Sequence, residues 1–249
     1  MVAVAATVSS GRVRCTAIEL YPEYPPGAVR VMPFRVAPFD NGMYIVVDER
    51  KDAIVIDPSM AEAEVMRAVR DEGLRILAIL NTHGHPDHVY DDAPVKAATR
   101  ARLAIHRLDA YRLDLAARPE GMRLPDGSEP FPPAPLAVAD DLLEEGPLRY
   151  LADVDMRALH TPGHTEGSTC FHLPKEDVLF SGDVLFAGAV GRVDLPGGDA
   201  RQMEASLQRV AALPPATRVY PGHGPPTTIG AELGWLRGSL ASGRSFRGD

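Results

Sequence analysis

The chain has 249 residues, of which 45% are hydrophobic and 24% are charged, and its formal net charge is −8. This composition is typical of a soluble globular protein, and an α/β chain of this length often forms one domain. The acidic balance argues against nucleic acid as the substrate, because proteins that bind nucleic acid normally present a basic surface.

The amino-terminal residues predict no signal peptide and no membrane anchor. The apolar run at residues 2–8 is short for a signal core, and no basic residue precedes it. No other apolar run is long enough to cross a bilayer. We therefore expect a cytoplasmic protein with no membrane contact. Its expected parts are a partly disordered extension at residues 1–28, a single domain at 29–230, and a helix with a tail at 231–249.

Strands and helices alternate through the first half of the domain. Short apolar runs predict strands at residues 43–47, 53–56 and 76–80, with a later one at 178–180. Ser59 and Glu62 have the spacing of a capping box, which predicts a helix that ends at Gly73. This alternation favours a layered α/β architecture.

Three histidines and an aspartate lie within six residues directly after the third of these strands. The segment reads His83-Gly84-His85-Pro86-Asp87-His88. In an extended segment alternate side chains share a side, so we expect His83, His85 and Asp87 to converge, with His88 approaching from the next turn. A chance cluster or an affinity tag is the alternative, but a tag is terminal and contiguous. The motif therefore predicts a metal site with room for two ions.

Residues 118–135 are rich in proline, glycine and charge, which predicts a long surface loop. Loops of this length in compact domains are often lids or binding loops. A plain surface excursion is the alternative, and the sequence does not decide between them.

Three later segments repeat one arrangement, in which an apolar strand is followed by a metal-type residue with Gly or Pro beside it. These residues are His164, Asp183 and His223. Small neighbours let the backbone turn sharply and let a ligand approach a crowded cation. Each segment alone is an ordinary turn more often than a ligand site. Together with the 83–88 motif they make a set of seven candidate ligands.

A second helix is predicted after Asp199, which is a favourable first residue for a helix. Its apolar positions recur at helical spacing and predict a core face rather than a cofactor site: Met203, Leu207 and Val210. The helix is expected to stop at Pro214-Pro215. One more helix is expected around residues 229–238.

From about Asn41 to Gly230, these motifs resemble the metallo-β-lactamase superfamily, specifically its glyoxalase II-like (hydroxyacylglutathione hydrolase-like) branch in the short bacterial form. The resemblance implies an αββα sandwich of two mixed β-sheets with helices on the outer faces and the metals at one edge. It also implies a ligand set: His83, His85 and His164 for the first metal, Asp87, His88 and His223 for the second, and Asp183 as the bridge.

The chemistry of two neighbouring metal ions explains why this ligand set is useful. Two divalent cations about 3.5–4 Å apart lower the pKa of a shared water toward 7 and polarise the carbonyl that the water attacks. We expect a metal-bound hydroxide, oriented by Asp87, to attack a thioester or ester, while Asp183 offsets charge between the ions. The glyoxalase II-like branch is best known for hydrolysing acyl-glutathione thioesters such as S-lactoylglutathione. No serine or cysteine nucleophile is then required.

Zinc is the metal we expect first, with iron or manganese as alternatives, because histidine and aspartate donors suit all three. No cysteine is among the proposed ligands. Cys15 and Cys170 lack the spacing of a metal site and are expected to be reduced.

Two further residues are candidates for roles near the metals. Asp57 ends an apolar strand and is a candidate partner for a metal-bound histidine, with a carboxylate that opens a turn as the alternative. Arg192 lies where the family places a basic residue near the substrate, with a surface salt bridge as the alternative. Three histidines outside the motifs are interpreted as core or surface residues: His106, His160 and His172.

Other functions remain open at this point. A related branch, the persulfide (sulfur) dioxygenases, keeps one iron on positions corresponding to His83, His164 and Asp183, but a complete second site would be superfluous there. A lactonase or a β-lactamase-like hydrolase stays within the same class of reaction. A non-catalytic binding protein is disfavoured by the intact ligand set. We expect a small-molecule partner, and the sequence leaves the oligomeric state open.

Overall fold

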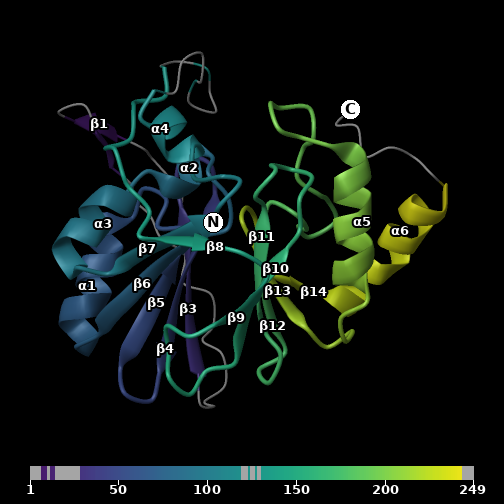
Figure 1. Ribbon diagram of the computed structural model, residues 1–249, viewed down its shortest axis with the longest axis horizontal. Coiled ribbons are helices and arrows are strands. Elements are labelled where there is room, and N and C mark those ends of the chain that lie inside the picture. Colours follow the sequence, from purple (N-terminus) through teal and green to yellow (C-terminus); the bar gives the residue numbers. More distant parts are fainter. Residues whose placement is uncertain are drawn as a thin grey trace.

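The structure is a computed structural model that describes residues 7–9, 12–14, 29–118, 123, 127 and 130–242. Two six-stranded sheets lie face to face, with α1 (Glu62–Glu72) and α3 (Asp92–Thr99) outside one of them. Helices α5 (Ala200–Ala211) and α6 (Ile229–Ser242) lie outside the other (Figure 1). This is the expected αββα sandwich. None of the described helices is long and apolar enough to cross a membrane.

The first sheet has the strand order β3-β4-β5-β6-β7-β8. Its strands are β3 (Val29–Val36), β4 (Asn41–Asp48), β5 (Asp52–Ile56), β6 (Arg75–Asn81), β7 (Arg102–His106) and β8 (Asp141–Leu143). The pairs from β3 to β5 are antiparallel and those from β5 to β8 are parallel. Helices α1 and α3 are the crossovers between parallel strands, as such connections require. The strands predicted at 43–47, 53–56 and 76–80 all lie within this sheet.

The second sheet has the order β14-β13-β12-β11-β10-β9. Its strands are β9 (Gly146–Leu148), β10 (Met156–His160), β11 (Thr169–Leu173), β12 (Val178–Gly182), β13 (Arg218–Pro221) and β14 (Thr227–Thr228). Only β12 and β13 pair in parallel, and α5 connects them. Both sheets are therefore mixed, as predicted.

Successive side chains of one strand point to opposite faces of the sheet, and a hydrophobic core covers each face. This explains why the strand sequences are unbroken apolar runs. In β4, Tyr44 and Val46 face the core between the sheets, where they meet side chains of the second sheet. Ile45 and Val47 face the opposite way and pack with the core under α1 and α3. Because both faces of the sheet are buried here, the sequence of β4 does not alternate between apolar and polar residues.

Helix α1 does not begin with the capping box that Ser59 and Glu62 predict. The helix starts at Glu62, whose N–H donates to Asp91 Oδ2 at 2.9 Å from a position 29 residues away. Ser59 lies at φ 52° and its hydroxyl contacts the carbonyl of Asp57. A tertiary contact thus replaces the local cap. Gly73 ends the helix in the left-handed conformation at φ 69°, as predicted.

The segment predicted as a surface loop at 118–135 is not wholly on the surface. Phe131 is buried, and its ring lies 5.4 Å from that of Phe39 and 5.6 Å from that of Tyr90. Ala134 is also buried. A few apolar side chains are enough to anchor the end of a charged, proline-rich stretch to the core. A lid role for the segment stays a prediction.

Most of the predicted extension at residues 1–28, including Cys15, lies outside the described residues. Within it, β1 (Thr7–Ser9) and β2 (Arg12–Arg14) pair in antiparallel fashion. Cys170, in β11, is buried and unpaired by any disulfide among the described residues.

Candidate metal centre

The seven candidate ligands lie where four strands end, at one edge of the sandwich. The 83–88 motif follows β6 of the first sheet. The other three follow strands of the second sheet: His164 after β10, Asp183 after β12 and His223 after β13. The ends of strands in α/β proteins are common ligand positions because loops from several strands meet there. The cluster therefore spans both sheets.

The 83–88 motif is only partly extended, which corrects the predicted geometry. Pro86 begins a one-turn helix, α2 (Pro86–Val89), and proline is favoured at this first helical position. Asp87 and His88 thus lie on a helical turn, whereas His85 is extended at φ −72° and ψ 144°. The convergence holds for a different reason. The bend at Pro86 turns the second half of the motif back toward the first.

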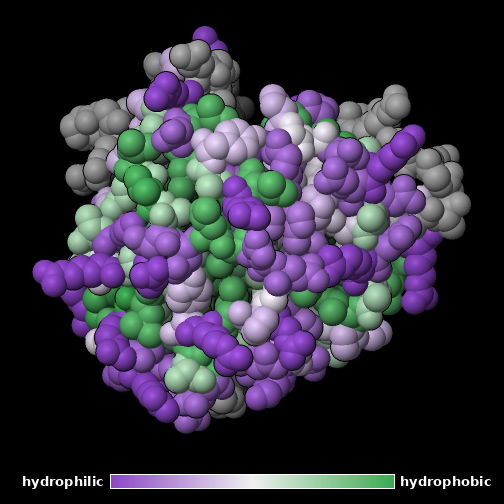
Figure 2. All heavy atoms as spheres, in the orientation of Figure 1, coloured by the Kyte–Doolittle hydropathy of each residue, from purple (hydrophilic) through white to green (hydrophobic). Residues whose placement is uncertain are grey.

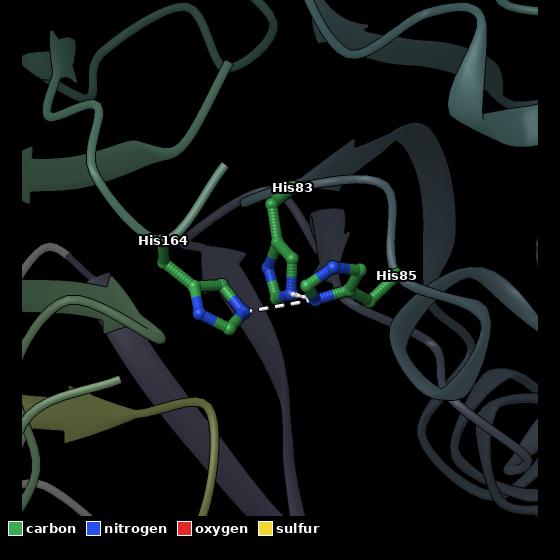
Figure 3. A group of neighbouring side chains, drawn as sticks. All are labelled: His83, His85 and His164. Atoms are coloured by element: carbon green, nitrogen blue, oxygen red, sulfur yellow. Dashed lines mark hydrogen bonds between the residues drawn. The ribbon is translucent and has the colours of Figure 1, made fainter. Parts of the chain in front are cut away.

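Three imidazoles form the first cluster (Figure 3). His85 Nδ1 lies 3.1 Å from His83 Nε2 and 2.8 Å from His164 Nε2. Figure 3 shows that His164 approaches from the side opposite to His83 and His85. The ring pairs meet edge to face, and the short distances show that one nitrogen of each ring lies at a common point.

The second cluster joins Asp87, His88 and His223. The Nε2 atoms of the two histidines are 3.2 Å apart, and His223 Nε2 is 3.5 Å from Asp87 Oδ2. Asp183 lies between the clusters, with Oδ2 at 3.3 Å from His164 Nε2 and at 3.4 Å from His223 Nε2. Its other oxygen is buried with no hydrogen-bond partner among the described residues. A carboxylate in this position can bridge two cations.

In three of the candidate ligand rings, Nδ1 faces away from the centre and is hydrogen-bonded to an oxygen. Such an acceptor fixes the proton on Nδ1 and leaves the Nε2 lone pair directed at the centre. The pairings are His88 with Asp57 Oδ2 at 3.0 Å, His164 with the Arg192 carbonyl at 2.7 Å, and His223 with the Phe39 carbonyl at 2.8 Å. This arrangement fits metal-bound histidines.

Asp57 is buried directly after β5, and its carboxylate accepts two hydrogen bonds from Thr82 in addition to its contact with His88. Thr82 donates to it through the backbone N–H at 2.8 Å and through the hydroxyl at 2.6 Å. The same hydroxyl lies 3.1 Å from His83 Nδ1. Asp57 therefore supports one ring of each cluster, directly for His88 and through Thr82 for His83.

The electrostatics of the two clusters differ. Burial and the neighbouring imidazoles hold the pKa of His83 well below its usual value and lower the pKa of His85 to about 3. Burial also acts to lower the pKa of His88 and His223, but nearby carboxylates outweigh it and raise them to about 8 and about 10. The first cluster thus offers neutral nitrogen donors and the second combines imidazoles with carboxylates. Both donor sets fit divalent cations.

The remaining predicted residues lie outside the clusters. The Arg192 guanidinium is exposed and pairs with Asp194 at 2.7 Å, so only its carbonyl reaches the centre. His160 stacks on His106 at a centroid distance of 4.1 Å, and its Nε2 contacts the Glu166 carbonyl. His172 lies in β11, partly exposed.

Two buried polar residues at the centre have no counterpart in the sequence analysis. Asn41 donates through Nδ2 to Asp87 Oδ2 at 3.0 Å. Asp109 accepts from the backbone N–H of Gly84, inside the motif, at 2.9 Å. Neither residue lies in a ligand-like motif. In the sequence, Asn41 stands out only as a polar residue at the start of an apolar strand, and nothing comparable marks Asp109.

Comparison with known proteins gives a family match over most of the chain. A family model described as the metallo-beta-lactamase superfamily matches residues 37–223. A protein named probable metallo-hydrolase, from Bacillus subtilis, is 31% identical over 78% of this chain and 90% of its own length. The hydroxyacylglutathione hydrolase of Cereibacter sphaeroides is 35% identical over 74% of this chain and 62% of its own length.

Solved structures share the fold. The BLEG-1 B3 metallo-beta-lactamase superposes with a TM-score of 0.74 at 32% identity, covering 83% of this chain and 99% of that one. TTHA1623 in a di-iron-bound form superposes with a TM-score of 0.68 at 40% identity, covering 80% and 96%. The second of these shows that a related chain holds two iron ions.

Proposed function

Because this chain belongs to the metallo-β-lactamase superfamily, we propose that it is a dinuclear metallo-hydrolase of the glyoxalase II-like type, which cleaves acyl thioesters. The observation that carries the proposal is the meeting of two donor clusters on either side of Asp183. The relatives named hydroxyacylglutathione hydrolase, at 32% and 35% identity, support the thioester as the substrate class.

The two clusters and Asp183 would hold two divalent cations, which would supply an activated water and polarise the carbonyl that it attacks. The side chains position these events. Asn41 donates to Asp87 Oδ2 and thereby fixes the plane of that carboxylate. Burial opposes ionisation of Asp87, but His88 and His223 lower its pKa, so at neutral pH it is an anion that can accept a hydrogen bond from the water and orient it.

Cys170 does not serve as a nucleophile. Burial raises the pKa of its thiol to about 12, so the reactive thiolate is absent at neutral pH. This is consistent with a hydrolase that uses water rather than a covalent acyl-enzyme.

For the metals we propose zinc, which suits the nitrogen and oxygen donors, with iron or manganese as alternatives. The di-iron-bound neighbour favours iron among these alternatives. For the substrate we propose a small molecule, since the net charge of −8 disfavours polyanions. Arg192, exposed beside Asp194, is the candidate to meet a substrate carboxylate.

Hydrolysis of a β-lactam ring is the second candidate. Its support is the likeness to a B3 metallo-beta-lactamase at 32% identity. The two reactions share an attack of water on an acyl carbon and differ in the leaving group, so the centre by itself permits both.

The test is a set of hydrolysis assays on metal-loaded protein with S-lactoylglutathione, other acyl thioesters, a lactone and a β-lactam. We expect thioester turnover. Asp87→Ala should lower kcat/KM about 10²- to 10⁴-fold, because it removes both the group that orients the water and one donor of the second cluster. His85→Ala should lower metal content and activity together, whereas His172→Ala should leave both unchanged.

Full activity in Asp87→Ala and His85→Ala would contradict the mechanism. β-Lactam turnover without thioester turnover would favour the second candidate. A single bound iron, with oxygen uptake on glutathione persulfide, would replace hydrolysis by persulfide oxidation.

A further inference from the structure

Asp109, in the turn after β7, is a fully buried carboxylate between two loops that carry candidate ligands. One of its partners lies inside the 83–88 motif, and two follow directly after His164. The donors are Gly84 N–H at 2.9 Å, Thr165 Oγ1 at 2.8 Å and Gly167 N–H at 2.8 Å. A single side chain thus ties a loop of the first sheet to a loop of the second.

Two glycines allow this close approach. A Cβ on Gly84 would lie 2.5 Å from the Cβ of Arg112, and a Cβ on Gly167 would lie 2.7 Å from the Cγ of Asp109. Contacts between carbon atoms are favourable only at about 3.5–4.0 Å, so neither position accepts a side chain unless the turn moves. Both loops are therefore built to pack against the turn at 109–112.

Arg112 extends the same junction. Its buried side chain pairs with Glu166, in the His164 loop, and donates to the Pro196 carbonyl at 2.8 Å. Pro196 belongs to the segment whose Arg192 carbonyl accepts from His164 Nδ1. The turn at 109–112 thus contacts the 83–88 motif, the loop that follows His164 and the segment that contains Arg192.

The second cluster is supported by a different segment, at residues 39–42. Asn41 contacts Asp87, and the Phe39 carbonyl accepts from His223 Nδ1. Gly42 N–H donates to the Gly222 carbonyl at 2.7 Å. Among the described residues, no hydrogen bond or ion pair joins Asp109 to this segment, so the supports at 109–112 and at 39–42 are distinct, and Asp57 is the residue that contacts both clusters.

We propose that Asp109 is a positioning residue for the first cluster. It sets the separation of the loops that carry His85 and His164, and thereby the metal affinity of that cluster, while the second cluster is independent of it. The inference rests on the proposed function only in that the centre binds metal. The reason is geometric: these two ligands come from different sheets, and a metal site tolerates errors of only about 0.5 Å in ligand position.

The test is Asp109→Asn, which keeps the shape of the side chain but replaces one accepting oxygen with a donor. Zinc binding is measured by competition with a chromophoric chelator, which resolves two binding steps. His164→Ala and His223→Ala identify the step that belongs to each cluster. We expect Asp109→Asn to weaken the first-cluster step about 10- to 100-fold, as loss of a supporting hydrogen bond does. The other step should change by less than about twofold.

A second variant and a matched control accompany this one. Thr165→Val removes one donor to Asp109 without a change in shape, and it should give the same selectivity with a smaller effect. Asp140→Asn is the control, because Asp140 also accepts from a backbone N–H, that of Leu103, and pairs with a cation, Lys96. It should change neither step. Circular dichroism of the metal-free proteins verifies folding, and Thr165→Val decides the matter if Asp109→Asn does not fold.

Equal weakening of both steps would overturn the proposal, because it would indicate a general structural role. No change in either step, or a loss confined to the second cluster, would overturn it as well. Selective weakening in a protein that hydrolyses no thioester would count against the proposed function alone. Thioester turnover in the wild type together with unselective weakening would count against Asp109 alone.

Discussion

Three of the candidate ligand histidines are oriented by oxygens that lie on the side of the ring away from the centre. His88 has a carboxylate there, whereas His164 and His223 have backbone carbonyls. A carboxylate makes an imidazole more basic than a carbonyl does, so these supports also tune the ligands. The strongest electrostatic difference, however, comes from Asp87 and Asp183, which face the second cluster and raise the pKa of its histidines.

Metal loading of the metal-free protein at pH 7 should release protons from the second cluster. The raised pKa values of His88 and His223, about 8 and about 10, mean that both rings hold a proton at this pH, and a ligand must be neutral. Affinity of that cluster should therefore rise with pH through this range. The lowered pKa values of His83 and His85 add no such dependence at neutral pH. Calorimetry in buffers of different ionisation enthalpy measures the released protons, and a release of none would refute this.

Helix α5 contacts the loop that carries His164 and so links the helix to the candidate metal centre. The carboxylate of Asp199, the residue just before the helix, accepts from the N–H groups of Arg201 and Gln202 at 2.8 and 3.0 Å. The Asp199 N–H donates to the carbonyl of Gly163, the residue before His164. Ser206, about two turns further along the helix, donates to the Pro162 carbonyl at 2.7 Å. The helix therefore fixes the loop from which His164 extends.

Asp199→Ala should destabilise the protein by about 1 kcal/mol, because it leaves the first N–H groups of α5 without their acceptor. Asp199→Ser, which restores a capping oxygen, should recover most of this loss. Chemical unfolding of the metal-free proteins gives both values. Equal stabilities of Asp199→Ala and the wild type would show that the cap contributes nothing.

The two sheets act as one body through the core between them. The ring of Tyr44, from the first sheet, lies 5.1 Å from Phe180 and 5.2 Å from Tyr220, both from the second. The Tyr44 hydroxyl donates to the Pro221 carbonyl at 2.6 Å, near His223. This core thus holds together the two halves from which the ligands come. On the outside, hydrophobic side chains form patches among hydrophilic ones (Figure 2).

Phe180→Ala should cost about 3–5 kcal/mol of unfolding free energy, since Phe180 is fully buried between the sheets and its loss leaves a cavity. The control is Leu136→Ala, because Leu136 is 58% exposed and its removal should stay within about 0.5 kcal/mol. Denaturant unfolding followed by circular dichroism compares the two. A similar cost for both would mean that the inter-sheet core is not what holds the sandwich together.

Much of the fold and the ligand types follow from local patterns. Strands buried on both faces leave unbroken apolar runs, as in β4 and β6, and these runs predict the layered sheets. The helix end at Gly73 and the start at Asp199 depend on neighbouring residues only, so their positions were predictable. The start of α1 was not, because its cap is Asp91, far along the chain.

The candidate ligands could be identified from the sequence alone, because histidine and aspartate donors at strand ends can be recognised from residue type and spacing. The tertiary structure alone decided which of these donors meet, and that Asp109 and Asn41 contact the segments that carry them. The contacts of Asp109 and Asn41 join residues 25 to 58 positions apart, and His88 and His223 are 135 positions apart. Contacts across such separations depend on how the two sheets pack rather than on any local pattern.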